Sequence, residues 1–250
     1  MRTSVRTGTV ADGLGTGHNG GVDVDLNADL GEEVTDDDAL LEVVTSANVA
    51  CGYHAGSLAI MRAVCERAAE LGVTVGAQVS YADRANFGRV ALDVPERVLR
   101  DQVADQVGTL VSVARAAGVD VRYVKPHGAL YHRVLDDEEQ ARAVLDGSGE
   151  LSVLGMVPGV LVDLARDRGR DVHSEAFPDR GYTPSGRLLG RDQPGALVAP
   201  ASAVARRAVE LAAQPHVDSL CLHGDSPGAV GTARLVRQAL EAAGWSLRGL

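Results

Sequence analysis

Short β-type runs alternate with longer helical patterns along most of the chain, and this alternation restricts the fold more than any other feature of the sequence. The strand candidates are 22–27, 46–50, 73–78, 121–125, 151–155, 172–176, 196–198 and 218–223. Helical patterns with capping signals or apolar periodicity lie at 57–71, 95–117, 201–213 and 227–243. A strand–helix–strand unit sets its two strands parallel with a right-handed crossover. The sequence therefore predicts an α/β fold, a parallel (β/α) barrel of seven or eight strands that forms one domain over residues 21–250.

Two stretches fall outside this alternation. Residues 1–20 are rich in Gly, Thr and Ser and show neither helical nor strand periodicity, so we expect a disordered lead. The segment 177–194 contains several Gly, Pro and Arg residues. We expect it to be a long strand-to-helix loop, the kind of segment that carries function in a barrel.

The charge and the cysteines exclude several classes of protein. The formal net charge of −10 argues against nucleic-acid binding, which needs clustered Lys and Arg. The three cysteines form no CxxC pair, so neither a disulfide framework nor a thiolate zinc site is expected. No apolar run is long enough to span a bilayer and no signal-peptide pattern is present, so we expect a cytoplasmic protein without a membrane partner. No GxxxxGK[ST] or GxGxxG sequence occurs, which argues against a self-contained phosphate-binding loop.

Polar side chains gather where the predicted strands end. In the first strand, Asp25 and Asn27 lie on the face opposite Val24 and Leu26. Both faces of a barrel strand are covered, and an unpaired buried charge is costly, so such residues need a use. Each alone could be a satisfied core or edge residue, but together they predict a ligand site at the carboxyl ends of the strands. The residues at or just past a predicted strand end are Asp25, Asn27, Asp29, His54, Lys125, His127, Glu175, His223 and Asp225.

Two motifs single out particular side chains. The glycines of CGYHAG predict a tight turn that presents His54 at the rim of the site, either as a packing residue or, beside Asp29, as a base or metal ligand. The motif KPHG ends another strand with a cation and an imidazole two residues apart. Lys125 must be paired or desolvated in that position, which favours a functional role. A thiol nucleophile at Cys221 is not favoured, because a cysteine and a histidine two apart on a strand need not meet.

Six motifs, taken in order, resemble the LamB/YcsF family: VDVDLNADLGEE, SANVACGYHAG, VGAQVSYADRANFGR, VKPHGALY, SEAFPDRGY and LCLHGDSPGAV. The characterised role of that family is the A subunit of a bacterial 5-oxoprolinase. The resemblance implies a barrel of the kind shared with polysaccharide deacetylases, with an incomplete or distorted ring. It also implies ATP-dependent hydrolytic ring opening of 5-oxo-L-proline to L-glutamate. Two partner subunits, B and C, would take part, and ATP would be consumed by the complex.

The implied reaction assigns roles to the strand-end residues. Ring opening needs a base for water, donors for the developing oxyanion and a group that holds the substrate carboxylate. Our hypothesis places Asp29 or His54 as the base, and Lys125 and His127 as the groups that stabilise charge. Arg180 would pair with the substrate carboxylate. The pocket-lining residues under this hypothesis are Asp25, Asn27, Gln78, Glu175, Arg180, His223 and Asp225.

Gln78 departs from the family pattern, which we expect to read GAHPSYPD where this chain reads GAQVSYAD. A histidine at position 78, with Asp29 and His54, would resemble the Asp-His-His metal triad of the related deacetylases. Gln78 is a weak ligand for a transition metal, so whether this chain binds a metal stays open. Two alternatives stay open as well: a metal-dependent deacetylase or amidohydrolase that needs no ATP, and a non-catalytic subunit that only completes a complex. The oligomeric state and the choice between 5-oxoproline and a related lactam are not predicted.

Overall fold

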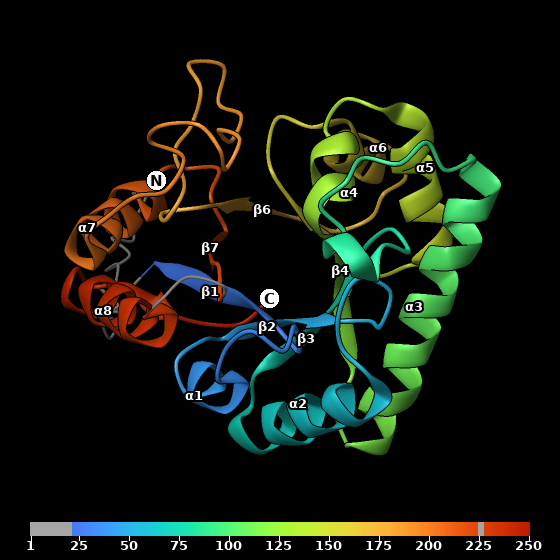
Figure 1. The fold of residues 1–250 in the computed structure, drawn as a ribbon. Coiled ribbons are helices and arrows are strands. Elements are labelled where there is room, and N and C mark those ends of the chain that lie inside the picture. Colours follow the sequence, from blue (N-terminus) through green and yellow to red (C-terminus); the bar gives the residue numbers. More distant parts are fainter. Residues whose placement is uncertain (1–21, 225–227) are drawn as a thin grey trace, which may run out of the picture.

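Within residues 22–224 and 228–250, the part of the chain that the computed structural model describes, seven parallel strands close a ring that is surrounded by helices (Figure 1). The strands are β1 (Asp23–Leu30), β2 (Ser46–Ala50), β3 (Thr74–Val79), β4 (Val121–Pro126), β5 (Ser152–Gly155), β6 (Val172–Ala176), β7 (Ser219–Leu222) and the short β8 (Ser246–Leu247). The helices are α1 (Asp37–Leu41), α2 (Leu58–Leu71), α3 (Glu96–Ala116), α4 (Gly128–Arg133), α5 (Glu138–Gly147), α6 (Val160–Asp167), α7 (Ala201–Ala212) and α8 (Ala229–Ala242), with a 3-10 turn at Arg84–Asn86.

Strand β1 closes the ring because it pairs with β2 on one side and with β7 on the other, both in parallel. The remaining neighbours follow the chain order from β2 to β7. Strand β8 pairs with β1 over only two residues, at Asp23 and Val24, and does not enter the ring. The predicted parallel (β/α) barrel of seven or eight strands is therefore confirmed, with seven strands in a closed ring.

Local signals explain where the helices begin and end. Ser57 caps α2 by accepting a hydrogen bond from the backbone N–H of Ile60, and Gly72 ends that helix in the left-handed conformation at φ 69°. Between these caps, Met61, Val64, Cys65 and Ala68 recur at helical spacing and are buried against the barrel. The four predicted helices are confirmed to within two residues at each end.

The inside of the ring is filled by side chains from the strands. Gly76 on β3 leaves space for the ring of Tyr123 on β4, since a Cβ at position 76 would overlap that ring. The absence of a side chain at Gly76 therefore lets Tyr123 reach across the barrel to Asn48 on β2, to which its hydroxyl donates a hydrogen bond of 2.7 Å.

The strand predicted at 196–198 is wrong. Leu197 forms only an isolated antiparallel bridge to Arg180, and the segment belongs to the irregular stretch between β6 and α7. No place in the ring is left for it, because β6 pairs directly with β7 through Glu175 and Ser219. The expected long loop at 177–194 is confirmed, whereas the short helices α1, α4, α5 and α6 and the strand β8 were not predicted.

The predicted lead at 1–20 lies outside the described residues. In the ranges 22–224 and 228–250, no helix combines the length and the hydropathy that crossing a bilayer requires.

Candidate functional site

A cavity of about 270 Å³ opens at the carboxyl ends of the strands, where the sequence predicted a ligand site. Its wall combines the ends of β1, β4 and β7 with the loop that follows β6. The volume lies just below the range of roughly 300–1,000 Å³ that is typical for drug-sized ligands, which indicates a small substrate. Of the predicted site residues, Asp29, Lys125, His127, Arg180 and His223 line this cavity.

Asp25 lies deeper in the barrel and does not line the cavity. Its carboxylate accepts hydrogen bonds of 2.7 Å from the hydroxyls of Thr45 and Ser46, and another from Ser219. Burial raises the pKa of Asp25 to about 6, although these three donors act in the opposite direction. The residue therefore joins β1 to β2 and β7 at the base of the site.

Asn27 lies two residues after Asp25 on β1 and points to the same face of the strand. Its amide nitrogen donates to the Ser219 hydroxyl at 2.6 Å, and its oxygen accepts from Asn48 at 2.7 Å and from Lys125 at 3.1 Å. Asn48 also donates to Asp29 at 2.9 Å. Asn48 was not predicted as a site residue, although it holds Asn27 and Asp29 in place.

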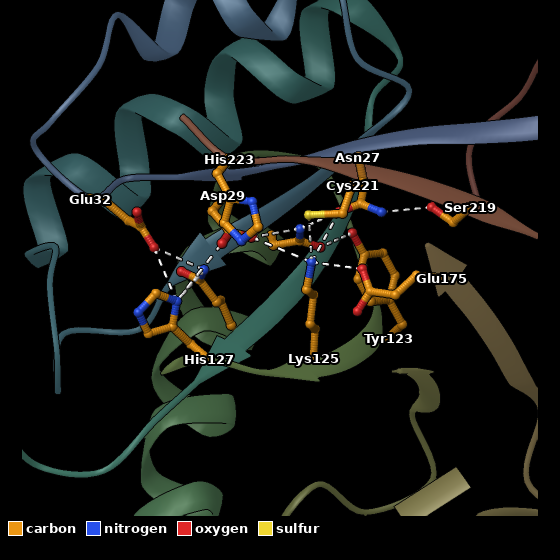
Figure 2. A network of polar contacts seen from close by, with 12 residues as sticks. Asn27, Asp29, Glu32, Tyr123, Lys125, His127, Glu175, Ser219, Cys221 and His223 are labelled. Atoms are coloured by element: carbon orange, nitrogen blue, oxygen red, sulfur yellow. Dashed lines mark hydrogen bonds and ion pairs between the residues drawn. The ribbon is translucent and has the colours of Figure 1, made fainter. Parts of the chain in front are cut away.

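Lys125 is the centre of the network in Figure 2, and only 3% of its surface is exposed. Its ammonium nitrogen lies 2.8 Å from Glu175 Oε2, 3.5 Å from Asp29 Oδ1 and 3.0 Å from Cys221 Sγ. Burial alone would lower the pKa of Lys125, but Cys221, Glu175 and Asp29 raise it well above its ordinary value. The prediction that this lysine must be paired is confirmed, and the side chain is a buried cation.

Asp29 carries the opposite charge at the cavity wall. Its burial acts to raise the pKa, but the charge of Lys125 outweighs burial and holds the pKa of Asp29 well below its usual range. Asp29 is thus an ionised carboxylate that faces the cavity.

A second cluster, formed by Glu32, His54, Gln78 and His127, lies beside this charge pair. The rings of His54 and His127 stack with centroids 4.1 Å apart. Glu32 Oε1 lies 3.3 Å from His127 Nδ1 and 3.7 Å from His54 Nε2. The amide nitrogen of Gln78 donates to Glu32 Oε1 at 2.9 Å and lies 3.0 Å from His127 Nδ1.

The cluster corrects two expectations. His54 is 1% exposed and lies behind His127, so the prediction that the CGYHAG turn presents it at the rim is wrong. Gly52 and Gly56 are both at positive φ, and Gly56 packs directly on the carbonyl oxygens of Ala50 and Gly31, so the turn lies close against the ends of β2 and β1. Glu32 was missed, although it follows Gly31 directly beyond β1 and so stands at a strand end like the residues that were selected.

Glu32, His54 and His127 could hold a metal ion, since one donor atom of each lies within 4.8 Å of the others. This set differs from the triad of Asp29, His54 and position 78 considered from the sequence. Both ring nitrogens of His54 are buried and lack a hydrogen-bond partner among the described residues. A buried nitrogen without a hydrogen-bond partner can bind a metal ion, so these residues are compatible with a metal site.

His223 lines the cavity just past the end of β7, and its Nδ1 lies 2.9 Å from Asp179 Oδ2. The same oxygen accepts a hydrogen bond of 3.0 Å from the backbone N–H of His223, and the imidazole stacks on Phe177. Asp179, which was not predicted from the sequence, therefore fixes the orientation of this ring. Arg180 lines the cavity and also donates to the carbonyl oxygen of Leu189 at 2.6 Å, which secures the loop after β6.

Glu175 lies behind Lys125 and does not line this cavity, and Asp225 lies outside the described residues.

Known proteins share this sequence and this fold. A model described as the LamB/YcsF family matches residues 24–250. The chain is 54% identical over 242 residues to the 5-oxoprolinase A subunit of Streptomyces avermitilis, a match that covers 88% of this chain and 97% of that protein. The structure is similar to that of a lactam utilization protein from Thermus thermophilus, with a TM-score of 0.86, 34% identity and coverage of 92% and 100%. The catalytic domain of a peptidoglycan N-acetylglucosamine deacetylase from Eubacterium rectale has the same fold at 14% identity, with a TM-score of 0.54 and coverage of 96% and 93%.

Proposed function

This chain belongs to the LamB/YcsF family, and from that premise we propose that it is the lactam-hydrolysing subunit of a cytoplasmic 5-oxoprolinase. In the proposed reaction, 5-oxo-L-proline is opened to L-glutamate, and two partner subunits, B and C, supply the ATP-dependent step. The observation that carries the proposal is the buried pair of Lys125 and Asp29, which sets an ammonium and an ionised carboxylate at the wall of a small cavity. The names of the relatives support 5-oxoproline as the substrate.

The chemistry explains why ATP is needed. A five-membered lactam is stabilised by resonance, so its carbonyl carbon is a poor electrophile for water. Phosphorylation of the lactam oxygen by the partner subunits would make that carbon reactive. This chain would then have to position a water molecule for attack on that carbon, stabilise the developing charge and protonate the ring nitrogen as the C–N bond breaks. The acyl phosphate formed in this way would be cleaved by a second water molecule, which releases phosphate and L-glutamate.

Asp29 is the better candidate for the residue that accepts a proton from water. It is ionised and lines the cavity, whereas His54 is buried behind the cavity wall. Lys125 and His127 would stabilise the negative charge that develops on the substrate.

His223 would return a proton to the ring nitrogen as the C–N bond breaks. Its Nδ1 is engaged by Asp179, which leaves Nε2 for the substrate. Arg180 at the cavity wall would pair with the substrate carboxylate.

The test is glutamate release from 5-oxoproline by the chain alone, with ATP, and with ATP and both partner subunits. We expect release only in the complete mixture, and loss of release in the Asp29→Asn and Lys125→Ala variants. Arg62→Gln, a change on the exposed face of α2, is the control and should keep the native rate. Full activity in the Asp29→Asn and Lys125→Ala variants would refute the assigned roles.

A second function is favoured by one observation, the cluster of Glu32, His54 and His127. If the chain alone cleaves amides without ATP, and a chelator abolishes that activity, a metal-dependent amidohydrolase replaces the lactam reaction as the function.

A further inference from the structure

We propose that Glu32, His54 and His127 bind one divalent transition-metal ion. For the ion to enter, the side-chain amide of Gln78 must turn away, and the stacked rings of His54 and His127 must tilt apart so that one nitrogen of each points at the ion. The inference concerns binding by this chain alone. It does not depend on the lactam reaction, because it is tested without substrate, ATP or partner subunits.

The spacing of the donor atoms supports a metal. Two ligands of a tetrahedral zinc ion, each about 2.0–2.2 Å from the metal, are about 3.3–3.5 Å apart. Glu32 Oε1 lies 3.3 Å from His127 Nδ1 and 3.7 Å from His54 Nε2, close to that separation on both sides. One carboxylate and two imidazoles also form the ligand set of many catalytic zinc sites.

His54 supplies an independent observation. It is 1% exposed, yet neither ring nitrogen has a hydrogen-bond partner among the described residues. Leaving a buried polar atom unsatisfied is costly, so the position of this ring is explained most simply by a ligand on Nε2, which faces Glu32.

One ring nitrogen of His127 already has the kind of partner that metal-bound histidines use. Its Nε2 lies 3.2 Å from the backbone carbonyl oxygen of Phe87, to which it can donate its proton. That hydrogen bond leaves the lone pair on Nδ1, the nitrogen that faces Glu32. Metal-binding histidines commonly donate their second nitrogen to a carbonyl or carboxylate in this way.

Gln78 occupies the entrance to these donors. Its amide nitrogen lies between Glu32 Oε1 and His127 Nδ1, so its two hydrogens use the same lone pairs that a cation would need. The amide oxygen of Gln78 is itself buried and lacks a partner within 22–224 and 228–250. Turning the amide away from these two atoms would free both ligands for the ion.

The site would keep one coordination position accessible. Glu32 and His127 both line the cavity beside Asp29, so a ligand molecule in the cavity can reach the ion from that side. A set of two nitrogens and one oxygen suits Zn²⁺ or Co²⁺ better than Mg²⁺ or Ca²⁺, which prefer oxygen ligands.

The experiment measures metal binding directly. The protein is stripped with a chelator, loaded with Zn²⁺ and desalted, and its metal content is measured by mass spectrometry. A parallel titration with Co²⁺ is followed by visible absorption. We expect one ion per chain and a cobalt spectrum typical of four-coordinate nitrogen and oxygen ligands. Retention of no ion by the folded native chain would overturn the proposal.

Matched variants locate the site. Glu32→Gln and His54→Gln should each weaken Zn²⁺ binding at least about 100-fold, since even changes around the ligands cost 10–100-fold. His223→Gln, which changes a histidine of the same cavity, should bind Zn²⁺ like the native chain. Equal metal content in all three variants would refute the site, and circular dichroism of each variant excludes unfolding as the cause of a loss.

Gln78→Ala tests the second half of the proposal. It removes the amide that competes for Glu32 and His127, so Zn²⁺ should bind about 10-fold more tightly or better. An affinity equal to or weaker than that of the native chain would show that the amide does not obstruct the site.

Discussion

Replacing Lys125 by methionine should destabilise the barrel strongly, because the change leaves two buried carboxylates without their cation. The lysine nitrogen lies 2.8 Å from Glu175 and 3.5 Å from Asp29, and both acids are buried. Breaking a buried ion pair by removing one partner costs about 3–5 kcal/mol. For a domain of this size each kcal/mol lowers the midpoint of thermal unfolding by about 2–4 °C. The expected fall in that midpoint is therefore about 6–20 °C.

A double variant separates the charge effect from the loss of packing. Lys125→Met with Glu175→Gln removes the cation together with one of the acids that it neutralises. If unpaired charge is the cause, the double variant should recover at least half of the free energy of unfolding that the single variant loses. Glu175→Gln alone is the second single variant that a double-mutant cycle requires.

The pH dependence gives a further check. In the native protein the pKa of Asp29 is depressed, so its contribution to stability is complete above about pH 4, the unfolded value, and is lost as pH falls further. Without Lys125, burial should raise the pKa of Asp29, and the variant should lose stability as pH rises above about 4. Urea unfolding of the native protein and of the Lys125→Met variant, each at pH 5 and pH 7, measures the two dependences. The reasoning would be refuted if Lys125→Met lost less than about 1 kcal/mol of the free energy of unfolding, or lost the same amount at the two pH values.

Three further changes test other layers of the barrel. Burial raises the pKa of Asp25 to about 6, so native stability should fall as pH rises from about 4 to 6, and Asp25→Asn should remove that fall in urea unfolding across this range. Gly76→Ala should lower the free energy of unfolding by at least about 1–3 kcal/mol, because the new Cβ overlaps the buried ring of Tyr123. The control is Gly108→Ala within α3, where a Cβ would meet no atom within 4 Å, and it should raise the free energy of unfolding by up to about 1 kcal/mol. Asp179→Asn should lower glutamate release by the complete complex about 10²–10⁴-fold, because His223 loses the partner that orients it. The midpoint of thermal unfolding should stay close to that of the native protein. An unchanged rate of glutamate release would show that His223 takes no part in the proton transfer.

Local sequence signals were sufficient to predict most of the helices and strands. Ser57 and Gly72 mark the ends of α2 in the sequence because a helix needs an acceptor at its start and benefits from a left-handed residue at its end. The apolar residues 196–198 read equally well as a strand or as a covered loop. Their state depended on the direct pairing of β6 with β7, which is a property of strand order and not of the segment itself.

The site was predictable to the extent that it lies at strand ends. Asp29, Lys125 and His127 were selected for that reason, and they meet at the cavity wall. The grouping of Glu32 with His54 was not predictable, because it depends on how far a turn folds inward. A pattern of alternating residues assigns a side chain to a face, but it does not give the depth at which the side chain lies.

Closure of the ring by β1 has a consequence for how the chain folds during synthesis. The side chain of Asn27 bonds to Ser219, a residue 192 positions later in the chain, and Asp25 bonds to the same serine. Strand β1 therefore lacks one of its two neighbours until Ser219, 192 residues after Asn27, has been translated. Until then β1 presents an unpaired edge, which is a site where nascent chains associate wrongly. We expect ring closure to be a late step of folding, and the yield of folded protein to depend on protection of that edge.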